Sequence, residues 1–291
     1  MSVPIRLVSP SDVSLRPFRL DRPTAAITID VESDHNSRQY EALARLPELL
    51  ALVRALEVPL TAFVEGQFFE NRSEVPQRLL EAGADVQLHC YDHVGPGDGP
   101  DDLARGIEAY RRLLGRAPRG YRAHTYRLTR ELLAALMAHG FEWDSSILPG
   151  LARGGNRGQG FGVRDCFTID DRLMEFPLAT WPVMSVPLIH SYRLMLGRPA
   201  EAMLRTLVGL PRLIVYDMHM ADLVWCRSLA TSPLPPHVKL LYRYMWGLNR
   251  GDSFESLRRF VRLLRARGYE LVTLSELNAR VGPSARGVEI G

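Results

Sequence analysis

The sequence predicts an α/β protein built around a parallel sheet or barrel, and two observations carry this prediction. Short apolar runs rich in β-branched residues alternate with longer segments whose apolar residues recur at helical spacing. Most of these longer segments are followed by a glycine, which commonly ends a helix. Repeated β-α units form a parallel sheet or barrel, and the active sites of such folds gather at the carboxyl ends of the strands.

Each strand is expected from an apolar run of strand length. The expected strands are residues 25–31, 59–64, 86–89, 120–123, 141–147, 173–178, 213–219 and 269–274. Each helix is expected from apolar residues three and four positions apart, as in Leu43, Leu46 and Leu50. The expected helices are residues 38–57, 73–82, 101–114, 129–139 and 253–267, and a glycine follows each of the last four.

Two segments interrupt this alternation. Residues 150–162 are rich in Gly and Arg, and we expect a loop over the active site there. Residues 221–250 mix prolines, aromatic and basic residues, and we expect an insertion or lid. We therefore predict a single domain at 24–277, preceded by an N-terminal extension at 1–23 and followed by a mobile tail at 278–291.

The composition argues against several classes of protein. The chain has 291 residues, of which 46% are hydrophobic and 24% charged, and its formal net charge is +3. This small charge and the lack of a nucleic-acid motif disfavour a nucleic-acid partner. Cys90, Cys166 and Cys226 show no CxxC spacing and fit a reducing compartment. The first 20 residues lack a secretory core, and no apolar run reaches the roughly 18 residues of a membrane span, so we expect a cytoplasmic protein.

The most informative stretch is His89-Cys-Tyr-Asp-His93, which follows an expected strand. A strand that continues into one helical turn places positions i and i+4 on the same side, where two neutral imidazoles can share a divalent metal. Two structural loop histidines are the alternative. Asp30 and Glu32 end another expected strand and face the same way. Two histidines and one carboxylate form a metal site with open positions, typical of Zn²⁺, and the other carboxylate is left as a base.

Three further residues at expected strand ends are candidates for the same site. Arg122 could keep a catalytic carboxylate ionised, or could be an ordinary surface arginine. Asp144 could pair with Arg122, or could serve a turn. His219 could protonate a leaving amine, although a lone histidine is more often structural.

In this order, these segments resemble the five motifs of the polysaccharide deacetylase family, also called carbohydrate esterase family four or the NodB-homology domain. The matching segments are T-I-D-V-E at 28–32, H-x-x-x-H at 89–93, G-Y-R-A at 120–123, D-S-S at 144–146 and M-H at 218–219. The first motif has the D-x-D/E form. The resemblance covers roughly residues 24–277 and implies a distorted (β/α)7 barrel that removes an acyl group from a sugar amide with the help of a metal.

The resemblance also implies a role for each candidate residue. Asp30 would be the base that activates the attacking water. Arg122 would tune Asp30, with Asp144 as the partner of Arg122, and His219 would be the acid. The implied metal ligands are Glu32, His89 and His93.

The chain departs from the family pattern at three places. Val31 stands where the second acid usually follows the first, so Glu32 must serve as the ligand, and Asp34 is a rival. His124 replaces a proline of the arginine motif and could narrow the groove or contact the substrate. Asp217 flanks the last motif, so the acetate pocket could differ.

The leading functional prediction is a hydrolase that removes an acetyl or formyl group from an N-acylated sugar. A cytoplasmic glycan precursor, such as a lipid-linked or nucleotide sugar, fits better than a wall polymer. Lipid-linked formamido-sugar deformylases share the D-x-D/E form. The alternatives are a C–N hydrolase of small cyclic amides or imides, and a non-catalytic carbohydrate-binding relative.

Several aromatic and basic residues bear on the substrate. The stretch at 238–246 could rest on a membrane face, although we favour an ordinary lid or core helix. Residues 175–178 are expected to line a groove. The aromatic residues that could stack on a sugar, or could equally belong to the core, are Trp181, Trp225, Tyr242 and Trp246. The arginines that favour a sugar carrying phosphate are Arg153, Arg157 and Arg164.

Overall fold

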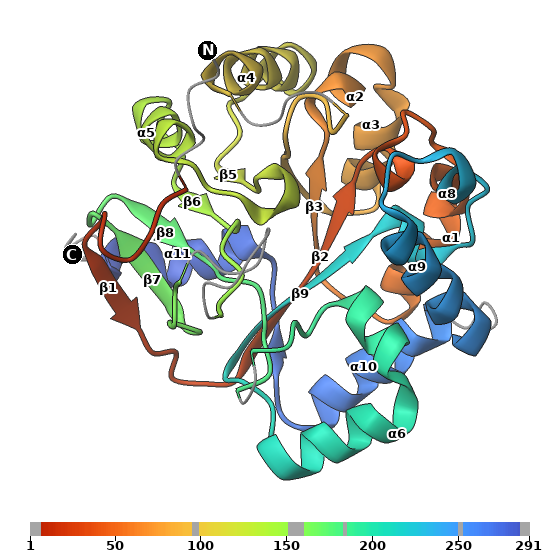
Figure 1. Ribbon diagram of the computed structural model, residues 1–291. Helices are drawn as coiled ribbons and strands as arrows, with labels where there is room; N and C mark the ends of the chain where they lie inside the picture. Colours follow the sequence, from red (N-terminus) through yellow and green to blue (C-terminus); the bar gives the residue numbers. More distant parts are fainter. Residues whose placement is uncertain (1–6, 95–98, 151–159, 183–184, 250–252, 286–291) are drawn as a thin grey trace.

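The structure is a computed structural model that describes residues 7–94, 99–150, 160–182, 185–249 and 253–285 (Figure 1). The strands are β1 (Leu15–Phe18), β2 (Thr24–Val31), β3 (Leu60–Val64), β4 (Asp85–Leu88), β5 (Gly120–Tyr121), β6 (Trp143–Asp144), β7 (Cys166–Ile169), β8 (Leu173–Glu175), β9 (Leu213–His219) and β10 (Glu270–Leu271). The α-helices are α1 (Leu46–Ala55), α2 (Gly66–Asn71), α3 (Glu74–Glu81), α4 (Pro100–Leu114), α5 (Arg130–Ala138), α6 (His190–Val208), α7 (Met220–Leu223), α8 (Ser228–Thr231), α9 (Pro236–Asn249), α10 (Ser253–Ala266) and α11 (Leu274–Ala285). Three short 3₁₀ helices are η1 (Asp34–Asn36), η2 (Glu41–Arg45) and η3 (His124–Tyr126).

Parallel strands form the centre of the fold. The parallel neighbours run in the order β9, β2, β3, β4, β5, β6 and β8. Beyond the end of β8, the Ala179 amide donates a hydrogen bond of 3.0 Å to the Val215 carbonyl of β9. This bond joins the two ends of the row, so the arrangement fits the expected distorted (β/α)7 barrel. A further short parallel strand, β10, pairs only with the first two residues of β2.

An antiparallel flap extends the sheet at one edge. Strand β7 pairs antiparallel with β8, and β1 pairs antiparallel with β7. The segment before residue 24 is therefore joined to the barrel, and Val8 within it is fully buried. Neither β1 nor β7 was expected, because both are short and carry no strong alternation of apolar residues.

Every strand expected from the sequence is present, usually with narrower bounds. The helix expected at 38–57 is wrong in its first part: Arg38 has a positive φ of 55°, η2 follows, and the α-helix begins only at Leu46. Pro47 explains this start, because proline is tolerated in the first turn of a helix but not in its interior. The boundary expected after residue 277 falls inside α11, where Asn278 is 1% exposed.

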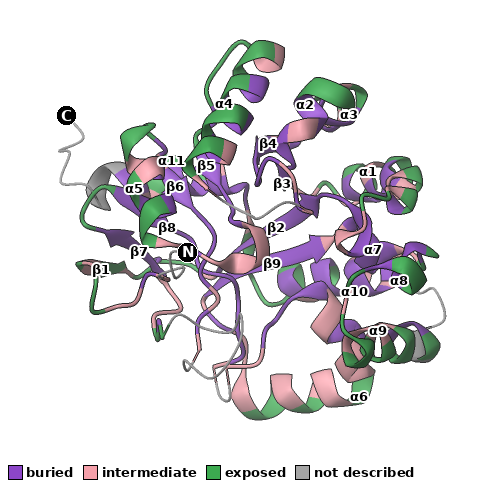
Figure 2. Cartoon of the chain, turned by 45° about the horizontal axis from the view of Figure 1, so that its top comes forward, coloured by how far each residue is buried: buried purple, intermediate pink, exposed green. Residues whose placement is uncertain are grey.

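The barrel strands are buried and the helices surround them. All eight residues of β2 are buried. Figure 2 shows buried strands at the centre, with the exposed residues on the outward sides of the helices. Among the described residues, no helix is both long enough and apolar enough to cross a membrane.

Candidate active site

Two neighbouring strands place polar side chains in layers inside the barrel. Thr28 lies opposite Asp217, and Asp30 lies opposite His219, in the parallel register of β2 and β9. Side chains alternate along a strand with a period of two, so all four point to the same side of the sheet. The next residue of that series on β2 is Glu32, just beyond the strand end. The carboxyl ends of β2 and β9 therefore build one polar cluster.

The expected metal ligands lie close together, with both imidazoles next to one carboxylate oxygen of Glu32. Glu32 Oε2 lies 3.1 Å from His89 Nε2 and 2.6 Å from His93 Nε2. The Nδ1 atom of His89 lies 2.6 Å from the Arg122 carbonyl oxygen, so the proton is fixed on Nδ1 and the Nε2 lone pair faces the cluster. The carboxylate and two imidazoles are all buried. This donor set suits a borderline-soft divalent cation, and the three residues form a group able to hold one.

The electrostatics of Glu32 agree with this arrangement. Burial alone would raise the pKa of its carboxyl group, but the neighbouring His93 and His219 outweigh burial and hold the pKa well below its usual value. Glu32 is therefore ionised and available as a ligand at neutral pH.

Asp34, the rival ligand, lies elsewhere. Its carboxylate accepts the amide hydrogen of Ala42 at 3.2 Å, and burial raises its pKa to about 6. Its place at the start of η1 turns it towards the 41–45 segment rather than towards His89 and His93. The structure thus groups the two histidines with Glu32.

Arg122 donates hydrogen bonds to several members of the buried polar cluster. Its Nη1 atom donates to Asp30 Oδ1 at 2.8 Å and also to Asp217 Oδ1. The same nitrogen donates to Thr28 Oγ1 at 2.9 Å, and the guanidinium lies 4.0 Å from the Phe63 ring centroid. The side chain is completely buried, so the alternative of a surface arginine is wrong.

The pairing of Arg122 with Asp144 is also wrong. The carboxylates beside the guanidinium are Asp30 and Asp217, whereas Asp144 accepts a hydrogen bond of 2.7 Å from Ser146 Oγ. Asp144 and Glu175 stand opposite each other on β6 and β8, and their side chains form a buried acid pair. Burial, with the Asp144 charge next, raises the pKa of Glu175 well above its usual value, so Glu175 holds a proton that it shares with Asp144.

His219 reaches the cluster from the end of β9. Its Nε2 atom lies 3.7 Å from Asp30 Oδ2 and 3.9 Å from Glu32 Oε1, and its Nδ1 atom lies 3.2 Å from Asp222 Oδ2. Burial lowers the pKa of the imidazole, but the hydrogen bond to Asp222 and the charges of Glu32 and Asp217 outweigh burial and raise the pKa well above 6.5. His219 is therefore protonated at neutral pH.

Tyr126 was not foreseen from the sequence. Its hydroxyl donates to Asp217 Oδ2 and lies 3.3 Å from His219 Nε2. Tyr126 is the last residue of η3, in which Thr125 and Tyr126 both have positive φ values, 55° and 56°. Non-glycine residues adopt this conformation at a cost of about 1–3 kcal/mol, and such strain concentrates at functional sites. A tyrosine four residues after an arginine motif gives no sequence signal of this kind.

His124 stacks on a metal-ligand candidate. Its ring lies 3.8 Å from the ring of His93, with an interplanar angle of 18°. Burial, followed by the charge of His93, lowers the pKa of His124 to about 3. His124 is therefore neutral near pH 7 and cannot replace His219 as the acid.

A cavity of about 280 Å³ opens above these groups. The residues that line it include Asp30, Glu32, His89, His93, Tyr126 and His219. The expected lid contributes Leu234 and Tyr242, and the Tyr242 ring lies 4.8 Å from the ring of His35. The expected lid thus walls the cavity with residues of α9 and of the segment before it.

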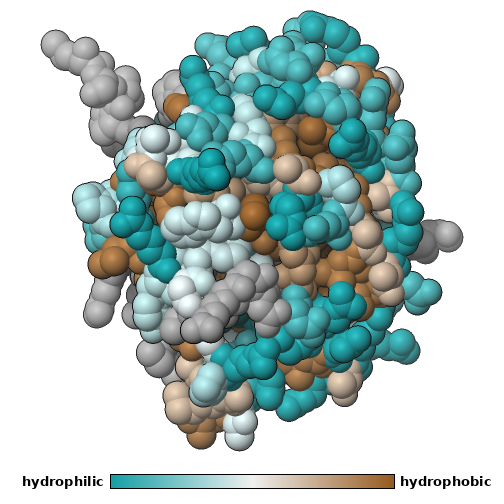
Figure 3. All heavy atoms as spheres, turned by 90° about the vertical axis from the view of Figure 1, so that its right-hand side faces the viewer, coloured by the Kyte–Doolittle hydropathy of each residue, from teal (hydrophilic) through white to brown (hydrophobic). Residues whose placement is uncertain are grey.

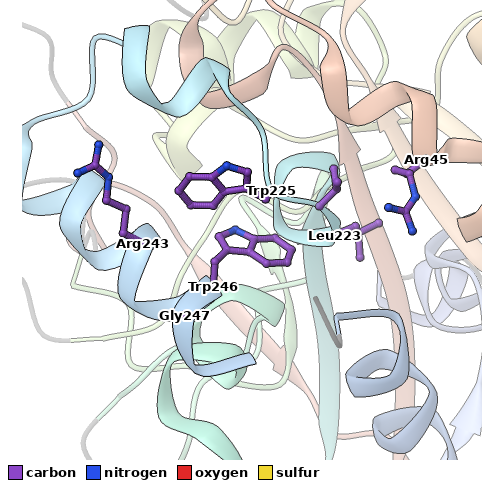
Figure 4. A pocket seen from close by; sticks show the side chains of 7 residues that line it. Arg45, Leu223, Trp225, Arg243, Trp246 and Gly247 are labelled. Carbon is purple, nitrogen blue, oxygen red and sulfur yellow. The ribbon is translucent and has the colours of Figure 1, made fainter. Parts of the chain in front are cut away.

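The other expected substrate contacts divide into three groups. Trp181 is buried core, and residues 175–178 are buried within the barrel rather than lining the cavity. Trp225 and Trp246 line a second cavity, with Arg45 and Arg243 (Figure 4). Arg164 donates to Thr180 Oγ1 at 3.2 Å, whereas Arg153 and Arg157 lie outside the described residues.

One comparison with known proteins is a family match over part of the chain. The family model for polysaccharide deacetylase matches residues 19–143. Over these residues the chain is similar to polysaccharide deacetylases. The matched segment contains Asp30, Glu32, His89, His93 and Arg122; the segments that supply Asp144, Asp217 and His219 follow it.

Two curated proteins match a similar length of this chain. The chain is 32% identical over 108 residues to the peptidoglycan deacetylase of Helicobacter pylori. This match covers 35% of this chain and 37% of the relative. It is 29% identical over 122 residues to a peptidoglycan deacetylase-like protein of Gibberella zeae, covering 40% of this chain and 36% of the relative. The matches therefore span little more than a third of the relatives' own length.

Solved structures agree on the fold. A candidate polysaccharide deacetylase from Mycobacterium smegmatis superposes with a TM-score of 0.50 at 18% identity, over 98% of this chain and 97% of the other. A carbohydrate esterase family 4 pseudoenzyme from Bacillus anthracis superposes with a TM-score of 0.52 at 14% identity, over 92% of this chain and 70% of the other. At such identities the likeness concerns the fold alone.

Proposed function

We propose that the protein is a metal-dependent hydrolase that removes an N-acyl group, acetyl or formyl, from a sugar. One observation carries the proposal: a buried base, a protonated imidazole and the three candidate ligands line the same cavity. The match to the deacetylase family supports the reaction class. We further propose Zn²⁺ as the ion, because two imidazoles and one carboxylate with open positions are typical of catalytic zinc.

When bound, the cation would polarise the amide carbonyl and lower the pKa of a coordinated water. The protein's own groups then divide the proton transfers. Arg122 Nη1 donates to Asp30 Oδ1 at 2.8 Å, and Asp30 would take the proton of the attacking water. His219 carries a proton on Nε2, the atom that faces Asp30 and Glu32, and would give it to the leaving amine.

Second contacts fix these two groups in place. Asp222 accepts from His219 Nδ1, which aims Nε2 into the cavity. Tyr126 approaches the same Nε2 atom while it donates to Asp217. The acid is thus held by the buried carboxylate of Asp222, whereas the base is held by the buried guanidinium of Arg122.

For the substrate we propose a glycan precursor inside the cell, such as a lipid-linked or nucleotide sugar. The three cysteines support a reducing compartment, since Cys90, Cys166 and Cys226 are all buried and none of them forms a disulfide. The names of the two curated relatives make peptidoglycan the competing substrate. The distinction is open to experiment because the candidate substrates differ in size and solubility.

The test measures release of free amine and of acetate or formate from zinc-loaded protein. The substrates are N-acetylglucosamine oligomers, an N-acetylated nucleotide sugar, a lipid-linked N-acylated sugar and peptidoglycan fragments. We expect turnover with at least one of these, and its loss in Asp30→Asn. No release from any of them, with zinc bound, would contradict a hydrolase and favour a non-catalytic relative.

Metal binding is tested separately by elemental analysis after exposure to zinc. His89→Ala and His93→Ala should each lose the bound ion. His139→Ala, which changes an exposed histidine at the end of α5, is the matched control and should retain it. Full occupancy in both ligand variants would refute the assignment.

A further inference from the structure

Helix α9 presents apolar side chains on two faces. One face is buried: Met245 and Trp246 pack with Leu194 of α6. On the other side, Leu240 is 66% exposed and Tyr244 is 55% exposed. These two residues are four apart and therefore lie along the same side of the helix, and Leu241 (42% exposed) adjoins them. Most exposed apolar side chains of a soluble domain are scattered, so a stripe of this kind suggests a surface that something covers.

An exposed indole lies next to α9. Trp225 is 47% exposed and shares a cavity of about 500 Å³ with Arg243 and Trp246 of α9 (Figure 4). We call Trp225, Leu240, Leu241, Arg243 and Tyr244 the α9 surface. Figure 3 views the side of the molecule that carries α1, α8 and α9, and hydrophobic areas interrupt the hydrophilic surface there.

The charged residues of the segment that carries the α9 surface are all basic. The sequence has no Asp or Glu from Leu223 to Asn249, whereas Arg227, Lys239 and Arg243 fall within that stretch. A run of exposed leucines, aromatic rings and basic residues is the composition of a helix that lies at a membrane interface. Anionic lipid headgroups attract such a surface electrostatically, while its leucines and rings enter the headgroup boundary.

A second copy of the chain is a poorer occupant. A two-fold contact would bring the α9 surface against itself, and the arginines and lysines of the two copies would then face each other. Like charges in contact oppose association. The charge pattern therefore favours a bilayer over a dimer.

We propose that the α9 surface docks the protein on an anionic lipid bilayer. The same helix supplies Tyr242 to the wall of the candidate active site, and the segment before it supplies Leu234. Docking through α9 therefore holds the mouth of that cavity near the lipid headgroups, where a lipid-linked sugar is found. This consequence for the substrate rests on the proposed function, whereas the docking itself does not.

The experiment is co-sedimentation of the full chain with sucrose-loaded vesicles. The vesicles contain either phosphatidylcholine alone or phosphatidylcholine with roughly 30% phosphatidylglycerol, enough to give a negative surface potential. We expect binding to the anionic vesicles, at least tenfold weaker binding to neutral ones, and a loss of binding as NaCl rises from ~0.1 to ~0.5 M. No sedimentation with anionic vesicles at low salt would refute the proposal.

Variants locate the contact. The triple change Leu240→Ser, Leu241→Ser and Tyr244→Ser should weaken vesicle binding at least tenfold, and Arg243→Glu should remove the preference for anionic lipid. Leu80→Ser is the matched control, because Leu80 is an exposed leucine (37%) on the distant helix α3. Equal losses in the control and the triple variant would overturn the assignment. So would a dimer, measured by light scattering, that the triple variant dissociates.

Turnover on a soluble N-acylated sugar separates this proposal from the proposed function. The triple variant should keep wild-type turnover there, because none of its three residues lines the active-site cavity. Turnover without vesicle binding would refute the docking surface alone. Vesicle binding without turnover on any sugar would refute the proposed function alone.

Discussion

Replacing Arg122 by methionine should destabilise the protein strongly. The guanidinium is fully buried between the carboxylates of Asp30 and Asp217, which are 1% and 0% exposed. Removing one partner of a buried ion pair leaves an uncompensated buried charge and typically costs about 3–5 kcal/mol. For a chain of this size, 1 kcal/mol corresponds to about 2 °C in Tm, so we expect a fall of about 6–10 °C.

The matched control is Arg119→Met. Arg119 also pairs with a carboxylate, through two hydrogen bonds of 2.6 Å to Glu142, but it is half exposed. Exposed ion pairs contribute about 0–1 kcal/mol, so the same substitution should lower Tm by at most about 2 °C. Thermal unfolding of both variants, followed by circular dichroism, measures the difference.

Rescue by a second substitution tests the cause. Adding Asp217→Asn to Arg122→Met removes one of the two unpaired charges, so the double variant should be more stable than Arg122→Met alone. Equal Tm values for the single and double variants would show that lost packing, rather than buried charge, causes the damage. Equal losses in Arg122→Met and Arg119→Met would refute the reasoning altogether.

The pH dependence follows from Asp217. Burial, followed by the charge of Asp30, raises its pKa from 3.8 to about 6, although Arg122 opposes this. The folded state thus holds this proton more tightly than the unfolded chain, and the stability contribution of the group falls as pH rises from 3.8 to about 6. Without Arg122 the pKa rises further. The deficit of Arg122→Met relative to wild type should therefore be small near pH 4 and grow as pH rises past about 6.

Three further predictions concern residues of the candidate active site. Asp30→Asn should lower turnover by ~10²–10⁴ yet keep its zinc by elemental analysis, because it removes a base rather than a principal ligand; wild-type turnover would contradict the role. His219→Ala should abolish the alkaline limb of the pH–rate profile, since loss of its proton lies well above pH 6.5, and the limb should stay in place between two metals if it belongs to His219. Tyr126→Phe should cost about 1–3 kcal/mol in chemical denaturation, because buried Asp217 loses a donor; an unchanged midpoint would exclude this.

The strands and the ligand group could be predicted because each depends on local pattern. An apolar run followed by two acids predicts β2. The spacing of His89 and His93 brings both imidazoles to one strand end. Periodicity of two along β2 also places Thr28, Asp30 and Glu32 on one side. These inferences need no knowledge of which strands become neighbours.

The positions of Tyr126 and of α9 could not be read in the same way. Tyr126 enters the site only because Thr125 and Tyr126 itself adopt left-handed backbone conformations, which their residue types disfavour. Helix α9 has apolar residues on both sides, so periodicity cannot tell the face that packs on α6 from the face that meets solvent. At Tyr126 the surrounding structure overrides the local preference, and at α9 it decides what the local pattern leaves open.

The ion-pair partner of Arg122 is a case in which the sequence pattern predicts the wrong residue. Asp144 ends β6 and Asp217 lies two residues before the end of β9, and both are completely buried. β9 lies directly beside β2, with Asp217 level with Thr28, so its carboxylate meets the guanidinium that already binds Asp30. β6 lies beside β8, with Asp144 level with Glu175, so its carboxylate meets another acid instead. Strand order around the barrel, which the sequence does not state, therefore decides that Asp217 rather than Asp144 balances the charge of Arg122 beside the proposed base.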